Sequence, residues 1–316
     1  MNKRRGARYL EQMGGVVIGG VQLSNPFMTA SGTSGKDIEL GGYMPLDRLG
    51  AVVVKSLFHE PWDGNPSPRV HVASSGMMNA VGLQGPGVVA WVHESLPKLE
   101  SVEATVVASI WGRSVHEYVL AAEQLVAAGN RIAAIEVNLS CPNLEGRSGI
   151  IAHDASLAGS IISAVCAQSR VPVWAKLSAN TDRIVEVATT VSDAGASAVT
   201  LINTMLGMQI DVRTSQRTLG NGGGGLSGSA IHPIAVRAVH DVRLALPDIS
   251  IIGVGGVASA ADALEMMMAG ANAVQIGTAS FARPDATWRI ACDAARKAHG
   301  LGAQSWSSIV NSVHRN

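Results

Sequence analysis

The chain has 316 residues and carries 24 Lys and Arg against 24 Asp and Glu, so its formal net charge is zero. This balance offers no basic surface for nucleic acid. The three cysteines, Cys141, Cys166 and Cys292, lie far apart without a CxxC pair, so the sequence encodes neither a disulfide framework nor a zinc or iron–sulfur site. A reducing, cytoplasmic location is therefore expected.

The first residues of the chain are basic, but no apolar run long enough for a signal peptide follows them. We interpret residues 1–15 as a solvated basic tail. The most apolar later stretch, residues 264–276, is interrupted by Glu265 and Asn272 and is too short to span a bilayer. No association with a membrane is expected.

Eight short apolar runs recur along the chain, at residues 26–30, 51–54, 105–110, 132–137, 173–177, 198–202, 249–254 and 273–276. Because they are apolar throughout rather than alternating, they are typical of parallel strands buried on both faces. Segments of helical period lie between or after them, at residues 115–128, 155–168, 182–193, 229–245, 260–269 and 284–298. This alternation predicts an α/β fold, a (β/α)8 TIM barrel that forms one domain over residues 1–316.

Two connections are too long for simple turns. Residues 57–92 follow the second run, and residues 203–228 follow the sixth. Long loops in compact domains usually bind ligands or act as lids, so we expect both over the carboxyl-terminal face of the barrel. Residues 223–228 match the GxGxxG pattern formally but follow no predicted strand. We interpret them as a flexible loop rather than a dinucleotide-binding turn.

The stretch from Asn138 to Leu144 directly follows the fourth apolar run. The amides of Asn138 and Asn143 flank Cys141, and a side-chain amide both donates and accepts hydrogen bonds. An isolated cysteine is more often a small buried hydrophobe than a functional group. Its position at the carboxyl end of a strand, where α/β barrels carry out chemistry, favours a site for an amide-ringed small molecule.

Glycines end the seventh and eighth strands, at residues 253–256 and at Gly277-Thr278. Such turns can close a barrel for steric reasons alone, but the loops after these two strands are the usual phosphate site of such barrels. Lys55, Lys176 and Asn203 also stand at strand ends. A single lysine could reach solvent, whereas two on one rim suggest an anion-rich ligand. The nine histidines show no metal-binding spacing, so no catalytic metal is expected.

Seven segments in order along the chain resemble class 1 dihydroorotate dehydrogenases: residues 55–66, 78–84, 137–143, 176–180, 201–204, 225–228 and 253–256. The resemblance extends from residue 16 to residue 285, and such an ordered set is highly specific. Residues 203–208 are more similar to the 1B branch than to the fumarate-using 1A branch. The 1B catalytic subunit works with an electron-transfer subunit that carries FAD and a 2Fe-2S cluster.

The resemblance implies a role for each matching position. Cys141 corresponds to the catalytic base. The positions that hold dihydroorotate or orotate are Lys55, Met78, Asn79, Gly82, Asn138, Asn143, Asn203 and Thr204. Those that contact one FMN per chain are Ala30, Ser31, Gly32, Lys55, Ser56, Ser109, Asn138, Lys176, Ile202, Gly228, Gly255, Gly256, Gly277 and Thr278.

Several positions depart from the family pattern. Ser109 replaces an asparagine that usually contacts FMN, Ala179 replaces a proline, and Trp62 replaces a common arginine. Ser229 and His232 replace a proline and a lysine. None of these changes touches Cys141 or the inferred orotate amides, so the implied activity stands while the contact from Ser109 stays open.

The expected function is FMN-dependent oxidation of (S)-dihydroorotate to orotate in pyrimidine biosynthesis, with Cys141 removing a proton and FMN accepting a hydride. A free thiol has a pKa of ~8.5, so it acts as a base near neutrality only where its surroundings favour the thiolate. We expect a homodimer that pairs with the electron-transfer subunit as a heterotetramer and passes electrons to NAD. The alternatives are a fumarate-linked enzyme, a flavin barrel that reduces another pyrimidine, and a non-catalytic barrel that binds a phosphorylated ligand.

Overall fold

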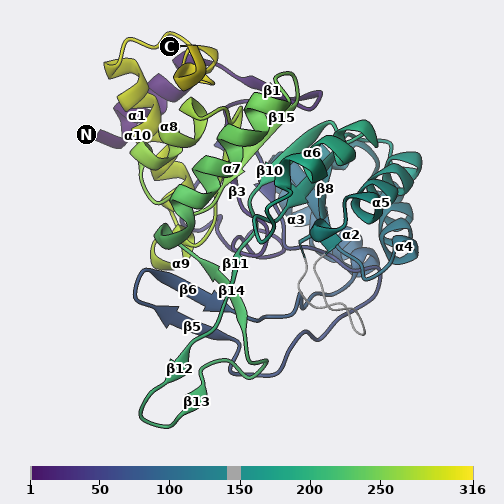
Figure 1. Ribbon diagram of the computed structural model, residues 1–316. Coiled ribbons are helices and arrows are strands. Elements are labelled where there is room, and N and C mark those ends of the chain that lie inside the picture. The colour runs from purple at the N-terminus through teal and green to yellow at the C-terminus, as the bar shows by residue number, and fades with distance from the viewer. Residues whose placement is uncertain (1, 141–150, 316) are drawn as a thin grey trace.

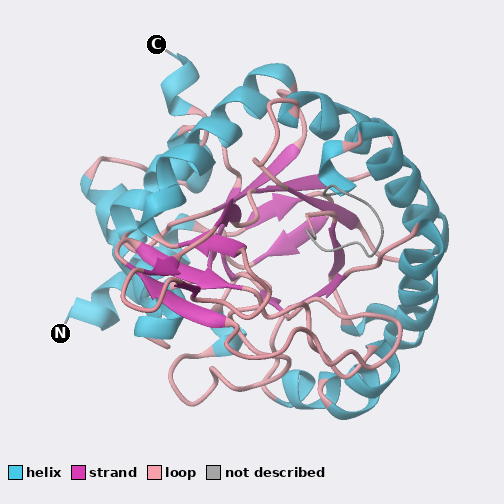
Figure 2. Ribbon diagram, turned by 60° about the horizontal axis from the view of Figure 1, so that its bottom comes forward, coloured by secondary structure: helices cyan, strands magenta, loops and turns pink. Residues whose placement is uncertain are grey.

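The computed structural model of the chain describes residues 2–140 and 151–315. Eight parallel strands form a barrel surrounded by helices (Figure 1, Figure 2). A bridge between Met28 and Ala51 joins the first of these strands to the second and closes the barrel. The predicted (β/α)8 barrel is confirmed, and each predicted strand is present. In chain order the barrel strands are β3 (Phe27–Thr29), β4 (Val52–Val53), β7 (Val106–Ile110), β8 (Ala134–Asn138), β9 (Val173–Leu177), β10 (Ala198–Leu201), β15 (Ser250–Val254) and β16 (Ala273–Ile276).

Three of the helices outside the barrel, α4, α5 and α8, begin at side chains that cap them. Ser114 caps α4 and Asp154 caps α5, while Ser259 and Asp262 form a capping box at the start of α8. The six predicted helices are present as α4 (Val115–Leu125), α5 (Ala155–Gln168), α6 (Ile184–Asp193), α7 (His232–Ala245), α8 (Ala260–Met268) and α10 (Ala286–Gly300). None of the helices in the described ranges is long and apolar enough to cross a membrane.

Short helices that the sequence did not predict complete the ring. The second strand is followed by α2 (Val88–Glu94) and α3 (Leu96–Ser101), which are too short to show a helical period. The remaining short elements are α9 (Ala279–Ala282), η1 (Leu46–Arg48), η3 (Ile151–His153), η5 (Trp306–Ser308) and η6 (Ser312–Arg315). Two more, η2 (Val126–Arg131) and η4 (Ser229–Ile231), overlap the predicted helices at residues 115–128 and 229–245.

The amino-terminal segment is not a solvated tail. It forms α1 (Asn2–Met13), which packs against α10 and buries Leu10 and Met13, while Tyr9 stacks on His299 with ring centroids 4.3 Å apart. The hairpin of β1 (Val16–Ile18) and β2 (Val21–Leu23) then contributes side chains to the apolar layer at the amino-terminal end of the barrel. The basic residues suggested exposure to solvent. The sequence could not show the packing of the apolar face, because its partner α10 is nearly 300 residues away.

The two long connections form a sheet rather than two loops. Its strands are β5 (Val70–Ala73), β6 (Gly76–Asn79), β11 (Met205–Gly207) and β14 (Gly224–Ser227), in the antiparallel order β11-β14-β6-β5. We call these four strands the arm sheet. The hairpin of β12 (Ile210–Asp211) and β13 (Gln216–Arg217) extends beyond it, away from the barrel (Figure 1). The interpretation of residues 223–228 as a flexible loop is therefore wrong, because Gly224–Ser227 pairs with strands on both sides.

Candidate active site

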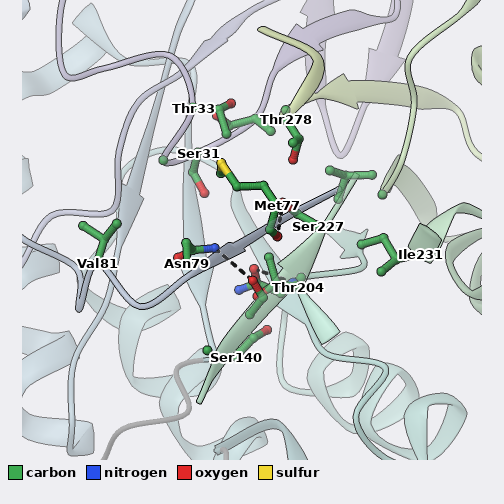
Figure 3. A pocket seen from close by; sticks show the side chains of 18 of the residues that line it. Ser31, Thr33, Met77, Asn79, Val81, Ser140, Thr204, Ser227, Ile231 and Thr278 are labelled. Carbon is green, nitrogen blue, oxygen red and sulfur yellow. Dashed lines mark hydrogen bonds between the residues drawn. The ribbon is translucent and has the colours of Figure 1, made fainter. Parts of the chain in front are cut away.

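A cavity of about 930 Å³ is bordered by the carboxyl ends of the barrel strands and by the arm sheet. In Figure 3, Thr33 and Thr278 lie at the opposite end of the drawn group from Ser140, with Asn79 and Thr204 between them. The structure brings most of the predicted site residues together here. Those that line the cavity are Ala30, Ser31, Gly32, Lys55, Ser56, Asn79, Gly82, Asn138, Lys176, Ile202, Asn203, Thr204, Gly228, Gly255, Gly256, Gly277 and Thr278.

Three amides of the cavity are held by the protein itself. Asn138, the last residue of β8, accepts from Asn203 Nδ2 at 3.1 Å and donates to Ser56 Oγ at 3.2 Å. The side-chain oxygen Oδ1 of Asn203 accepts from the Thr204 N–H at 2.9 Å, and Asn79 Nδ2 donates across the arm sheet to the backbone carbonyl of Gly225 at 3.3 Å. Each primary amide has two donors and one acceptor oxygen, so each retains capacity for a ligand. The rim is therefore preorganised for a molecule with both donors and acceptors.

Two lysines supply positive charge to the same cavity. Lys176 is buried, with Nζ 3.1 Å from Ser31 Oγ and 3.5 Å from Glu136 Oε1. Burial lowers the pKa of Lys55, and the charge of Arg69 lowers it further. Glu136 already supplies an anion to Lys176, so it is the charge of Lys55 that favours a ligand carrying negative charge.

The turns after β15 and β16 bring backbone to the cavity wall. Gly255 and Gly256 have φ angles of 136° and 67°, which residues with a side chain rarely adopt. A Cβ on Gly256 would lie 2.7 Å from the Cβ of His232, so only glycine fits there. This close approach of backbone, next to Gly277 and Thr278, suits an anion such as phosphate.

Two predicted contacts lie beside the cavity rather than on its wall. Met78 is buried in a cluster with Ala80 and Leu219 because alternate residues of β6 face opposite sides, so Met77 and Asn79 line the cavity instead. Ser109 lies inside the barrel, where its hydroxyl is 2.8 Å from that of Ser56. It thus contacts a cavity residue. Cys141 and Asn143 lie outside the described residues.

An aromatic wall of the cavity escaped the sequence analysis. Trp62 and Trp111 line it, and Phe58 stacks on Trp111 with centroids 4.6 Å apart. The guanidinium of Arg113 lies 5.1 Å from the Trp62 ring centroid, and Trp62 donates its indole N–H to the Gly82 carbonyl at 2.9 Å. Trp111 is buried, and its own indole N–H has no partner in the described part of the chain. Only the departure at position 62 from the family pattern hinted at this wall.

The chain is similar to proteins of one family over most of its length. A family model described as dihydroorotate dehydrogenase matches residues 13–296. The catalytic subunit of dihydroorotate dehydrogenase B (NAD(+)) from Geotalea uraniireducens (strain Rf4) is 43% identical over 276 residues, 87% of this chain and 90% of its own. The subunit of that name from Bacillus pumilus (strain SAFR-032) is 44% identical over 85% of this chain and 86% of its own, and that from Desulforudis audaxviator (strain MP104C) is 42% identical over 95% and 97%.

Proposed function

This chain belongs to the dihydroorotate dehydrogenase family, and we propose that it oxidises (S)-dihydroorotate to orotate in pyrimidine biosynthesis. One observation carries the proposal beyond family membership. The amides of Asn79, Asn138 and Asn203, the two lysines and the glycine turns all border a single cavity. A planar, anionic, amide-containing substrate beside a phosphorylated cofactor would use all three groups of residues.

The family implies a flavin, and we infer that it is FMN. The described cavity fits such a group, because its volume of about 930 Å³ lies within the range of cofactor sites. Its lining also offers backbone N–H groups at the glycine turns and side-chain donors from the lysines and amides. The turns at Gly255-Gly256 and Gly277-Thr278 would hold the phosphate, and Lys176 with Ser31 would face the ring system. When bound, FMN supplies the acceptor for the hydride that leaves the substrate.

The substrate would occupy the amide end of the cavity. Lys55 would pair with its carboxylate, and Asn79, Asn138, Asn203 and Thr204 would bond the ring amides. Since these groups are already held by one another and by the arm sheet, an analogue that lacks one ring amide would leave a buried polar group unpaired, at about 1 to 3 kcal/mol. The amide rim therefore supports selectivity for a pyrimidine.

We assign the proton-accepting role to Cys141. It lies outside the described residues, so the assignment rests on the resemblance and on its place three residues after Asn138. Ser140, the residue before it in the sequence, is held in place, because its N–H donates to Asn138 Oδ1 at 3.2 Å and its hydroxyl to the Lys176 carbonyl at 3.1 Å. Asn143 stays a predicted substrate contact on the same grounds.

We propose that electrons pass to NAD through a partner subunit that carries FAD and a 2Fe-2S cluster. The relatives are named as NAD(+) catalytic subunits, which favours NAD over fumarate as the final acceptor. A homodimer within a heterotetramer and a cytoplasmic location are further parts of this proposal. Contact with another chain is supported by exposed apolar residues at alternate positions from β11 to just after β12. They are Leu206, Met208, Ile210 and Val212.

An absorption spectrum of the purified chain tests the proposal directly. We expect a flavin spectrum that bleaches when dihydroorotate is added without oxygen. A flavin that stays oxidised would move the substrate to another pyrimidine, and a protein that binds no FMN would contradict the proposal.

Two further measurements test the assigned residue and the partner. Cys141→Ala should retain FMN but reduce it far more slowly, and unchanged reduction would remove Cys141 from its role. Full-rate NAD reduction by the chain alone would contradict the proposal that electrons reach NAD through a partner subunit.

A further inference from the structure

His232 ties the glycine turn of the cavity to two helices. It is the first residue of α7 and is largely buried. Its Nδ1 lies 2.9 Å from the Gly255 carbonyl oxygen, and its Nε2 lies 3.2 Å from a carboxylate oxygen of Glu265 on α8. We call these two contacts the His232 clasp. The turn after β15 is thereby fixed to the start of α7 and to the middle of α8 by one side chain.

The clasp determines which way one peptide group faces. A carbonyl oxygen only accepts, so Nδ1 donates its proton to Gly255. In a trans peptide the C=O and the next N–H point in opposite directions. The Gly256 N–H therefore points away from His232. Both glycines line the cavity, and no described residue accepts a hydrogen bond from the Gly256 N–H.

We propose that His232 is a positioning residue for the phosphate end of the cofactor site. By holding the Gly255 carbonyl, it presents the Gly256 N–H to a phosphate oxygen of FMN. The inference rests on the proposed function, because it needs FMN in this cavity, but it concerns a residue that would itself make no contact with the cofactor.

The backbone at this turn needs such a restraint. With φ angles of 136° and 67°, two consecutive glycines have few steric limits, and the peptide between them could rotate. A Cβ on either would collide with α7, at the Cβ of Ala235 for Gly255 and at that of His232 for Gly256. The close approach thus excludes the side chains that would otherwise stiffen the turn, and the His232 clasp replaces them.

Glu265 is needed to complete the clasp. Its carboxylate also only accepts, so this second contact is a hydrogen bond when Nε2 carries a proton. A lysine, the residue expected here from the family pattern, could donate to the same two acceptors. Glutamine at 265 could instead donate to Nε2, which would let a neutral ring keep its bond to Gly255.

The test compares FMN with riboflavin, which has the same ring system but no phosphate. Each ligand is titrated into the apo form of the full chain, and quenching of flavin fluorescence gives the Kd. We expect His232→Ala to raise the Kd of FMN about tenfold, as expected when one well-placed hydrogen bond is lost, and that of riboflavin less than about twofold. His232→Lys should restore FMN binding to within about threefold of the unaltered chain.

Two controls separate positioning from other effects. His240→Ala changes another histidine of α7, which contacts Asp241 and His314 rather than the turn, and should leave both Kd values unchanged. Glu265→Gln keeps both hydrogen bonds without charge and should bind FMN within about threefold of the unaltered chain. Thermal unfolding of each apo variant identifies any that fails to fold. If His232→Ala fails to fold, the His232→Lys variant still tests the inference.

Three results would overturn the inference. Equal FMN affinity in His232→Ala and the unaltered chain would show that the turn needs no clasp. Equal losses for FMN and riboflavin would show a general structural role, and a loss in Glu265→Gln as large as in His232→Ala would show that charge rather than orientation matters. If the unaltered chain bound neither flavin, the proposed function itself would fail, which is a distinct result.

Discussion

Glu136 and Lys176 form an ion pair inside the barrel, with Glu136 Oε1 3.5 Å from Lys176 Nζ and both side chains almost fully shielded from solvent. The other carboxylate oxygen of Glu136 accepts from the Thr200 hydroxyl at 3.0 Å and from the Gln275 amide at 2.6 Å. Lys176 in turn reaches Ser31 on the cavity wall. A buried carboxylate thus compensates the lysine that we place near the flavin ring.

Glu136→Gln should destabilise the apo protein by about 3 kcal/mol, because removal of one partner leaves the other charge buried and unpaired. Urea unfolding of the two single variants, Glu136→Gln and Lys176→Met, and of the double variant measures the coupling. The double variant should be less destabilised than the sum of the two. Additive effects would show that the two side chains do not interact energetically.

Orotate affinity should fall as the pH rises through the lowered pKa of Lys55. The charged ammonium attracts the substrate carboxylate, and this attraction is present below that pKa and lost above it. Because the shift is downward, the loss begins below pH 10.5, the ordinary value for lysine. Titration of orotate into the holoenzyme between neutral and alkaline pH measures it. Lys55→Arg keeps its charge and should give a flatter profile, and parallel profiles would contradict the assignment.

Trp111→Phe should weaken orotate binding by about threefold to tenfold, since it removes an unpartnered indole N–H from the cavity wall but keeps the stacked ring. Trp174→Phe is the matched control. Its indole N–H is also buried without a described partner, but Trp174 belongs to the apolar layer at the other end of the barrel. Orotate titrations that respond equally in both variants would mean that Trp111 contributes stability alone.

Gly256→Ala should abolish FMN retention and lower the melting temperature. The new Cβ would lie 2.7 Å from the Cβ of His232 and 2.8 Å from the Gly228 carbonyl oxygen. Gly302→Ala separates this clash from backbone strain, because Gly302 also has a positive φ, 85°, but open space around it. It should cost only about 1 to 2 kcal/mol and leave FMN bound. Similar losses in both variants would indicate strain rather than the close approach of backbone.

Charged residues on the hairpin of β12 and β13 should weaken self-association. Ile210 and Val212 are exposed at alternate positions, so replacement of both by lysine leaves the barrel untouched. Light scattering should show a lower mass than for the unaltered chain, with flavin reduction retained. Val17→Lys, at an exposed apolar residue of β1, is the control. An unchanged mass would place any contact between copies elsewhere.

The sequence was informative wherever the signal was local. The apolar run at residues 173–177 predicted a buried strand correctly, because both faces of β9 are covered and every one of its residues is buried. Asn138 and Lys176 could be assigned to one rim because both stand at or next to the carboxyl end of a parallel strand, and the structure pairs them in register. The arm strands carry no comparable signal. β14 is the glycine-rich segment Gly224–Ser227, and its partner β6 is about 150 residues earlier.

The sequence by itself determined the fold class and the set of residues at the strand ends, because hydrophobic periodicity and glycine punctuation act over a few neighbouring residues. It also indicated the family, through the seven segments that resemble it. The tertiary structure alone decided that α1 packs on α10, that Met77 rather than Met78 faces the cavity, and that His232 holds the Gly255 carbonyl. These contacts join residues that are remote in the chain or depend on which face of a strand is turned inward. They arise only when long-range packing selects one arrangement among many that the local sequence allows.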